Sequence, residues 1–402
     1  MSEVRKAVQK LYNTYPFPPD PLLDEPPPGY NWRWHYQSAY NFCTGMKPQK
    51  EKIRILDAGC GTGSTTEYLV LHNPFAEIIA IDLSENALAT AQKRLEKSGV
   101  LKNFHGTITF QQLILESATT LEGTFDLINS VGVLHHLPEP EIGIKALAEK
   151  LAEGGIMHIF VYGELGRWEI SLMQKAIALL QGEKRGDYVD GVKVGRDIFA
   201  SLPEDNRLVM KEKQRWQWEN QRDECFADMY VHPCETDYNI DTLFDFIKVS
   251  GLDFISFSNP DTWQLERLIG KNKDLINKAN NLTSQEYYRL IELLDPDNIT
   301  HYEFFLGKPP LKRETWVNDE LLKSAKPELN PCMLGWESKS LFDYQFQPIT
   351  LDDEEFIFMQ YCAKNPQKNL TVDDIISQTN FSLDRVRSLI KKQLIMMTLD
   401  FN

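Results

Sequence analysis

Three glycines in the segment IRILDAGCGTG, residues 53–63, are spaced so that backbone amides can come close to a ligand. Gly59, Gly61 and Gly63 follow an apolar run that ends at Asp57, which is the pattern of a β-strand entering a loop. Because glycine has no Cβ, a ligand can approach the main chain of such a loop closely. The segment therefore predicts a binding loop at the carboxyl end of a strand.

The residues around this loop distinguish three ligands that it could hold: a dinucleotide, a phosphate and S-adenosylmethionine. A nicotinamide loop, GxGxxG, needs glycine where this chain has Ser64, and a Walker phosphate loop needs a lysine that is absent. A second apolar run, residues 78–84, contains Asp82, whose carboxylate can accept hydrogen bonds from both hydroxyls of a ribose. The two segments together favour S-adenosylmethionine.

Short β-branched runs alternate with helical segments between residues 52 and 163, as is typical of a parallel sheet wound with helices. The expected strands are 53–58, 77–83, 107–112, 125–131 and 156–162, and the expected helices are 64–72, 85–99 and 139–155. Two later strands, 253–258 and 302–308, flank a helical insertion and are expected to pair as an enlarged hairpin at the sheet edge. We therefore expect an α/β fold with a doubly wound, mostly parallel sheet.

The 402-residue chain is longer than one hydrophobic core usually organises, so several folded parts are expected. Residues 1–50, rich in proline and aromatic side chains, are predicted to form an N-terminal arm or lid. Residues 51–308 are predicted to carry the sheet, with helical insertions at about 166–223 and 261–295. The sequence pattern of residues 311–402 predicts three helices and a strand, which suggests a small winged-helix-like module. Its first helix is acidic, which favours a structural or docking role over DNA binding.

The charge of the chain and the spacing of its cysteines argue against several kinds of partner and against a zinc site. A formal net charge of −15 disfavours nucleic acid, and no segment is apolar over the length of a bilayer, so we expect neither a nucleic-acid nor a membrane partner. The six cysteines are scattered, which favours reduced thiols in a cytoplasm. Cys225, His232, Cys234 and Glu235 lie close in sequence but match no standard zinc spacing, so we expect no metal.

Two further segments extend the pattern of the glycine loop. The loop, IAIDLS (79–84), FDLINSVGVLHHL (125–137) and ALAEKLAEGGIMHIF (146–160) resemble, in order and spacing, the motifs of class I S-adenosylmethionine-dependent methyltransferases. The resemblance is strong over 52–162 and looser over 225–308. It implies a Rossmann-like fold and S-adenosyl-L-methionine as cofactor. The residues that it implies around the cofactor are Asp57, Gly59, Cys60, Gly61, Gly63, Asp82, Leu83, Gln112, Leu113 and Ser130.

The chain departs from the family pattern after the third strand. Many members place an aspartate there to meet the adenine amino group, whereas this chain reads QQLILE over residues 111–116. We expect Gln112 to offer its amide carbonyl instead, with Leu113 and Ile114 packing on the adenine ring.

The candidates for groups that contact the methyl acceptor lie beyond the strand ends. Methyl transfer depends mainly on alignment of the acceptor with the methyl carbon, followed by removal of a proton. The candidates are Asn129, His136, Tyr162, Glu164 and His232. We hypothesise that at least one of His232 and Glu164 lines the acceptor pocket.

The parts outside the sheet make up more than half the chain, which favours a large acceptor, and the acidic charge favours a protein. The overall layout faintly resembles the asparagine N-methyltransferases that modify phycobiliproteins in cyanobacteria, which implies a side-chain amide as acceptor. One alternative is a small aromatic metabolite enclosed by Tyr15, Phe17, Trp32, Trp34 and Tyr36. Another is a catalytically silent cofactor-binding scaffold protein.

Overall fold

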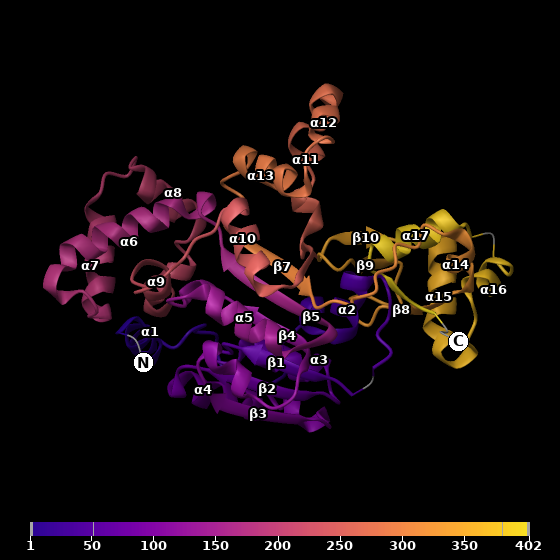
Figure 1. The fold of residues 1–402 in the computed structure, drawn as a ribbon, viewed down its shortest axis with the longest axis horizontal. Coiled ribbons are helices and arrows are strands. Elements are labelled where there is room, and N and C mark those ends of the chain that lie inside the picture. The colour runs from indigo at the N-terminus through magenta and orange to yellow at the C-terminus, as the bar shows by residue number, and fades with distance from the viewer. Residues whose placement is uncertain (1–2, 51, 380, 400–402) are drawn as a thin grey trace.

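A seven-stranded sheet forms the centre of the protein in a computed structural model that describes residues 3–50, 52–379 and 381–399 (Figure 1). Its strand order is β3-β2-β1-β4-β5-β7-β6. Strands β1 to β5 are parallel, and β7 runs antiparallel between β5 and β6. The strands are β1 Arg54–Ala58, β2 Glu77–Asp82, β3 Thr107–Gln112, β4 Phe125–Val131, β5 Leu151–Tyr162, β6 Asp253–Phe257 and β7 His301–Gly307. The expected doubly wound sheet and the expected β6–β7 hairpin are both confirmed.

Helices cover both faces of the sheet, because side chains alternate between its faces along each strand. Ile55, Leu127 and Ile156 belong to a core with helices on one face, whereas Leu56 and Ile128 belong to a core on the other. The first face is covered by α2 Tyr36–Thr44, α3 Ser64–His72 and α4 Glu85–Ser98, and the second by α5 Pro140–Lys150 and α10 Ile240–Ser250.

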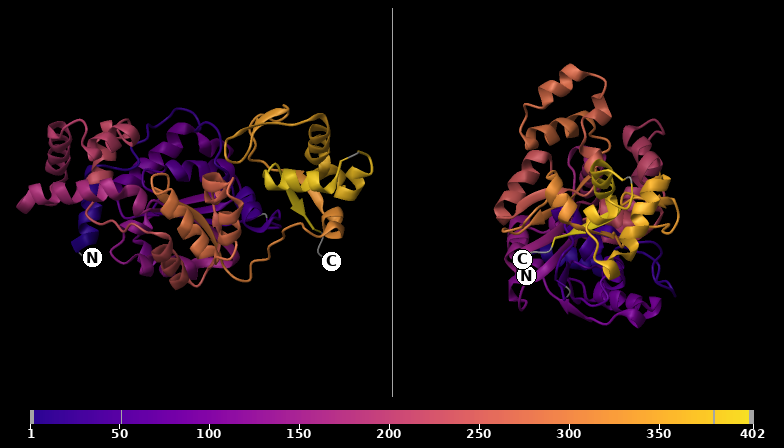
Figure 2. Two further views of the ribbon diagram at one scale, coloured as in Figure 1. Left: turned by 90° about the horizontal axis from the view of Figure 1, so that it is seen from above. Right: turned by 90° about the vertical axis from the view of Figure 1, so that its right-hand side faces the viewer.

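Two groups of helices extend the sheet domain. The first comprises α6 Trp168–Gln181, α7 Tyr188–Ser201, α8 Arg207–Arg215 and α9 Asp223–Tyr230. The second comprises α11 Glu266–Ile269, α12 Lys273–Ala279 and α13 Ser284–Leu294, which project from the β6–β7 hairpin. Figure 2 shows the first group at one end of the molecule and the C-terminal module at the other. Within the described ranges, no helix combines the length and the apolar composition that crossing a bilayer demands.

The C-terminal module has its own apolar core, which includes Phe358, Met359 and Leu389. Its helices are α14 Asp319–Ser324, α15 Asp353–Lys368, α16 Val372–Ile376 and α17 Leu383–Lys391, and its strands are β8 Lys326–Leu329, β9 Ser340–Phe342, β10 Pro348–Thr350 and β11 Ile395–Thr398. Strand β11 pairs antiparallel with β8, and β10 with β9. The three helices and the final strand expected from the sequence are present, whereas α14 and β8 to β10 were not foreseen.

The predicted helix 139–155 is wrong for its last five residues, because α5 ends at Lys150 and β5 begins at Leu151. The register of β5 on β4 slips between Phe125 and Leu127, which leaves a bulge on the β5 side. Gly154 supports this bulge with a φ of +71°, and its N–H donates to the Lys308 carbonyl at 2.9 Å. The alanine-rich composition had favoured helix here, but tertiary pairing decides the conformation.

The aromatic segment around Trp32 packs in the core and does not form a lid. Trp32 is 1% exposed, and its ring lies 4.6 Å from that of Phe42, 5.6 Å from that of Phe305 and 5.5 Å from that of Tyr344, measured between centroids. These contacts join the arm to β7 and to the C-terminal module. The segment that covers the carboxyl ends of the strands is instead α1, Glu3–Thr14, with the turn that follows it.

Candidate active site

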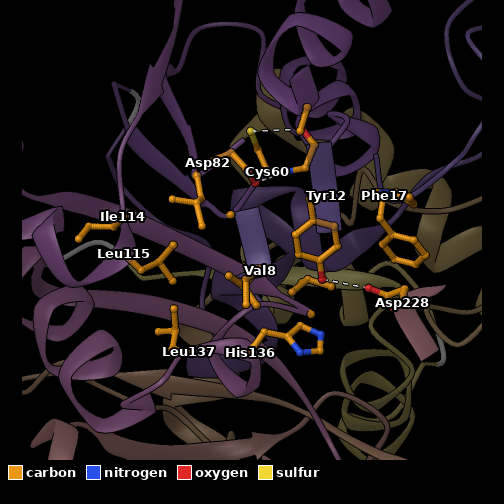
Figure 3. A pocket seen from close by; sticks show the side chains of 18 of the residues that line it. Val8, Tyr12, Phe17, Cys60, Asp82, Ile114, Leu115, His136, Leu137 and Asp228 are labelled. Carbon is orange, nitrogen blue, oxygen red and sulfur yellow. Dashed lines mark hydrogen bonds between the residues drawn. The ribbon is translucent and has the colours of Figure 1, made fainter. Parts of the chain in front are cut away.

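A cavity of about 380 Å³ lies at the carboxyl ends of β1 to β5, within the usual size range of small-ligand sites (Figure 3). Most of the residues that line it come from α1 and the following turn, the glycine loop, the strand ends with the segments after β3 and β4, and α9. The lining includes Arg5, Val8, Tyr12, Phe17, Gly59, Cys60, Gly61, Asp82, Leu83, Leu113, Ile114, Leu115, Glu116, His136, Phe160, Tyr162 and Asp228. We call it the cofactor cavity.

The glycine loop contributes its first two glycines to the cofactor cavity. Gly59 and Gly61 have φ values of +86° and +52°, a conformation that other residues rarely adopt. A Cβ on Gly61 would lie 2.5 Å from the Phe17 carbonyl oxygen. Gly63 does not line the cavity; a Cβ there would lie 2.6 Å from Ala91 Cβ, so this glycine allows α3 and α4 to pack closely.

Asp82 places a carboxylate in the wall of the cofactor cavity. Its Oδ2 accepts the Gly61 N–H at 2.9 Å and its Oδ1 accepts the Ser84 N–H at 2.8 Å. Burial raises the pKa of Asp82, although these backbone hydrogen bonds oppose the shift. The acid at the end of β2 is therefore tied to the loop after β1, as a shared ligand site requires.

Asp57 lies beneath the glycine loop and does not reach the cavity. Its two carboxylate oxygens accept Thr66 Oγ1–H at 2.7 Å and Asn129 Nδ2–H at 2.9 Å. Burial raises the pKa of Asp57 to about 6, although both hydrogen bonds favour its ionised form. Asp57 therefore supports the loop from below.

Asn129 continues this buried network into the sheet. Its Nδ2 is used by Asp57, so its Oδ1 accepts the His158 Nδ1–H at 2.8 Å. His158 Nε2 then lies 3.1 Å from Glu303 Oε1. Burial opposes ionisation of Glu303, but the hydrogen bond and charge of His158, together with Arg33, lower its pKa to about 2. Asn129 thus positions strands and does not line the cavity.

The corner expected for adenine is apolar and ends in an ion pair. Leu113, Ile114 and Leu115 line it, followed by Glu116, whose carboxylate lies 2.8 Å from the Arg5 guanidinium. Gln112 is exposed and lies outside the cavity, because its side chain turns back to donate to the Leu83 carbonyl.

The remaining predicted residues differ in position. Ser130 is fully buried, lies outside the cavity, and its hydroxyl has no hydrogen-bond partner among the described residues. Glu164 also lies outside, because its carboxylate accepts from Asn239 Nδ2 at 2.7 Å. His136 and Tyr162 line the cofactor cavity, and His232 stacks behind His136. Neither His232 nor Glu164 lines the cofactor cavity or the second cavity described next.

A second cavity of about 470 Å³ adjoins the first. The two share Phe17, Pro18, Phe160, Tyr162 and Asp228. The second cavity continues between the turn after α1 and the segment that leads into α9, where its walls include Arg167, Trp216, Arg222 and Met229. We call it the acceptor cavity, because a group that enters from this side reaches the shared wall directly. Of the aromatic enclosure expected for a small metabolite, only Phe17 lines either cavity.

Tyr12 and Asp228 are functional candidates that the sequence did not reveal. Tyr12 OH donates to Asp228 Oδ1 at 2.9 Å and so joins α1 to α9 across the cavities (Figure 3). Burial raises the pKa of both side chains. They are separated by 216 residues in sequence, and no local spacing connects them.

Three potential metal ligands do come together, although no metal was expected. The ligand atoms of His136, Asp228 and His232 lie within 4.8 Å of one another.

Comparison with known proteins identifies the class. A family model described as a methyltransferase domain matches residues 56–157, the segment that carries the glycine loop and Asp82. PKMT2 from Rickettsia typhi has the same fold, with a TM-score of 0.61 at 13% identity over 92% of this chain and 76% of PKMT2. The family match and the cavity of suitable size beside the loop define a class I S-adenosylmethionine-dependent methyltransferase, with S-adenosyl-L-methionine as its cofactor.

The relatives identify the family within this class. An uncharacterized Synechococcus protein (strain ATCC 27144 / PCC 6301 / SAUG 1402/1) is 55% identical over 394 residues, which are 98% of this chain and 93% of that protein. The uncharacterized phycocyanin operon protein W of Pseudanabaena tenuis (strain PCC 7409) is 65% identical over 96 residues, 24% of this chain and 91% of that protein. The chain belongs to the family of these two proteins.

Proposed function

We propose that this methyltransferase modifies a protein side chain, and that the acceptor is the amide nitrogen of an asparagine in a phycobiliprotein. The observation that carries the proposal is the acceptor cavity, which meets the cofactor cavity at Phe160, Tyr162 and Asp228. A side chain that enters there reaches the place where the methyl group is presented, while its backbone stays outside.

The cofactor cavity suits S-adenosylmethionine in this proposal. The loop from Gly59 to Gly61 holds the methionine part, and Asp82 holds the ribose hydroxyls. Leu113 and Ile114 flank the adenine ring, and Glu116 lies at its edge. When bound, the cofactor supplies an electrophilic methyl group on a sulfonium.

Exposed apolar side chains on the helical insertion support a macromolecular acceptor. Large apolar side chains are exposed on the helical insertion: Leu179 is 82% exposed, Leu180 69% and Trp218 77%. Exposed apolar residues of this size are typical of contact surfaces, and Leu179 and Leu180 are neighbours on α6. The identity of the protein partner is supported by the relative named as a phycocyanin operon protein.

The experiment is transfer of tritium from labelled S-adenosylmethionine to purified phycocyanin, with an Asp82→Ala variant as the inactive control. Label should appear in the phycocyanin protein with the wild type and not with Asp82→Ala. Acid hydrolysis should then release it as methylamine, because a methylated amide nitrogen leaves with its methyl group. Labelled methanol from a methyl ester, labelled methyl-lysine or a labelled organic-soluble product in place of methylamine would contradict the amide assignment.

A further inference from the structure

The main chain of Cys234 accepts a hydrogen bond from one histidine and donates a hydrogen bond to another. Its carbonyl oxygen, which can only accept, lies 3.0 Å from His136 Nδ1, so this nitrogen carries a hydrogen. Its N–H, which can only donate, lies 3.2 Å from His232 Nδ1, so this nitrogen offers its lone pair. In their neutral forms, His136 therefore has a free lone pair on Nε2, whereas His232 carries its hydrogen on Nε2.

The two rings lie against each other at the inner wall of the cofactor cavity. Their centroids are 3.7 Å apart and their planes differ by 26°. His136 lines the cavity, and His232 Nε2 is buried with no hydrogen-bond partner among the described residues. The Asp228 carboxylate lies within 4.8 Å of the ligand atoms of both rings. A basic nitrogen, a hydrogen-bond donor and a carboxyl group thus meet where the two cavities join.

We propose that His136 Nε2 accepts the proton that the acceptor nitrogen loses during methyl transfer, and that Asp228 stabilises the resulting imidazolium. This inference rests on the proposed function. The nitrogen–carbon bond forms as the sulfur–carbon bond breaks, and the bonding pair returns to sulfur. The N–H proton moves to His136 Nε2, so the amide leaves as a neutral N-methylamide and the positive charge of the sulfonium is transferred to His136.

The hydrogen-bond pattern distinguishes this role from metal binding. Two histidines and a carboxylate can hold a divalent metal, but each metal-bound nitrogen must offer a lone pair. The Cys234 N–H uses the lone pair of His232 Nδ1, and this leaves a hydrogen on Nε2, the nitrogen that would otherwise have to bind the metal. The cluster therefore offers one basic nitrogen and one donor.

Asp228 is the acid that faces His136 directly. The other titratable groups around it come from its own turn, β5, α1 and the segments after β5 and α9: His135, Tyr162, Tyr12, Arg167 and His232. Burial lowers the pKa of His135 and His232 and raises the pKa of both tyrosines, which favours the neutral form of these four groups. The Arg167 charge is paired with Glu235. An imidazolium formed at His136 therefore lies beside the Asp228 carboxyl group, and its positive charge opposes the rise in the pKa of Asp228 that burial causes.

The test uses His136→Asn, because asparagine keeps an amide N–H near the position of Nδ1 and so keeps the bond to Cys234, while it removes Nε2. His105→Asn, at a histidine outside both cavities, is the matched control. Single-turnover methyl transfer should fall about 10²- to 10⁴-fold in His136→Asn, the usual contribution of a general base, and stay near wild type in the control. Calorimetry should show unchanged S-adenosylhomocysteine binding in both variants.

Two further readouts do not depend on the rate alone. The pH profile of the wild-type rate should contain a limb that is absent from the profile of His136→Asn. Imidazole ¹H–¹⁵N spectra of the wild type should show hydrogen on Nδ1 of His136 and on Nε2 of His232.

Three results would overturn the proposal: a wild-type rate and pH profile in His136→Asn, the same tautomer in both rings, or a stoichiometric metal that activates the enzyme. If label from the wild type enters a small molecule, the proposed protein acceptor fails, but the effect of His136→Asn on that transfer still decides the role of His136.

Discussion

The Arg5 guanidinium and the Glu116 carboxylate lie 2.8 Å apart and join α1 to the segment after β3 at the cofactor cavity. Glu116→Gln removes the charge of this partly buried pair, which is worth about 1 kcal/mol. We expect the cofactor product to dissociate about fivefold faster, because every 1.4 kcal/mol is a factor of ten. Stopped-flow displacement measures this rate. Glu3→Gln, which breaks only the exposed Lys6–Glu3 pair within α1, should leave it unchanged; equal rates in the two variants would contradict a role of α1 in retaining the cofactor.

Gly61→Ala should abolish tight cofactor binding and lower the stability of the protein. The new Cβ would lie 2.5 Å from the Phe17 carbonyl oxygen, at a residue whose φ of +52° already disfavours alanine. Backbone strain of this kind costs about 1–3 kcal/mol, before the clash is added. Gly29→Ala is the control, because its φ is +76° and nothing lies within 4 Å of the new Cβ. Calorimetry and urea unfolding measure the two effects, and comparable losses in both variants would show that strain alone is responsible.

Thr66→Val should raise the pKa of Asp57 above its value of about 6, because the lost hydroxyl stabilises the ionised carboxylate. The folded pKa already exceeds the ordinary value of 3.8, so the folded state binds more protons than the unfolded state between these values. Stability should therefore fall as pH rises from about 4 to about 6, and in Thr66→Val the fall should continue to higher pH.

Urea unfolding at a series of pH values measures this shift. Thr90→Val is the control, because it removes a hydroxyl that bonds only to the Asn86 carbonyl within α4. A Thr66→Val profile that matches the wild type would mean that the Thr66 hydroxyl does not support the Asp57 carboxylate.

Trp32→Ala should lower the free energy of unfolding by about 3–5 kcal/mol, the usual cost of removing a large aromatic side chain from a core. Trp32 is 1% exposed and contacts the arm, β7 and the C-terminal module, but it lines neither cavity. Cofactor affinity of the folded variant should stay unchanged. Trp218→Ala removes a tryptophan that is 77% exposed and should cost little stability. A loss of cofactor affinity in Trp32→Ala would instead support a lid role for this segment.

The sheet could be predicted because its inner parallel strands, such as β1 and β4, are buried on both faces and so read as short apolar runs. The glycine loop could be predicted because its conformation restricts residue type. Gln112 and Glu164 were chosen for their places after a strand, yet their side chains are used by the Leu83 carbonyl and by Asn239. Sequence position places a residue at a strand end but does not fix the direction of its side chain.

The contact between Tyr12 and Asp228 could not be predicted, because it exists only when the first helix and the helical insertion meet over the sheet. Asp228 lies in α9, where an acid ordinarily faces solvent, and nothing in its neighbourhood distinguishes it. The acceptor side of the site is built from such long-range contacts, whereas the cofactor side is built mainly from one continuous segment.

Because Val8 and Tyr12 of α1 form part of the cofactor cavity, docking of this helix and occupancy of the cavity are linked equilibria. A cofactor that binds the docked form more tightly shifts α1 toward docking, and the docked helix strengthens cofactor binding by the same factor. Undocking would expose Leu11, now 1% exposed, to solvent and to proteases. The proteolytic lifetime of the first helix should therefore follow the concentration of the methyl donor.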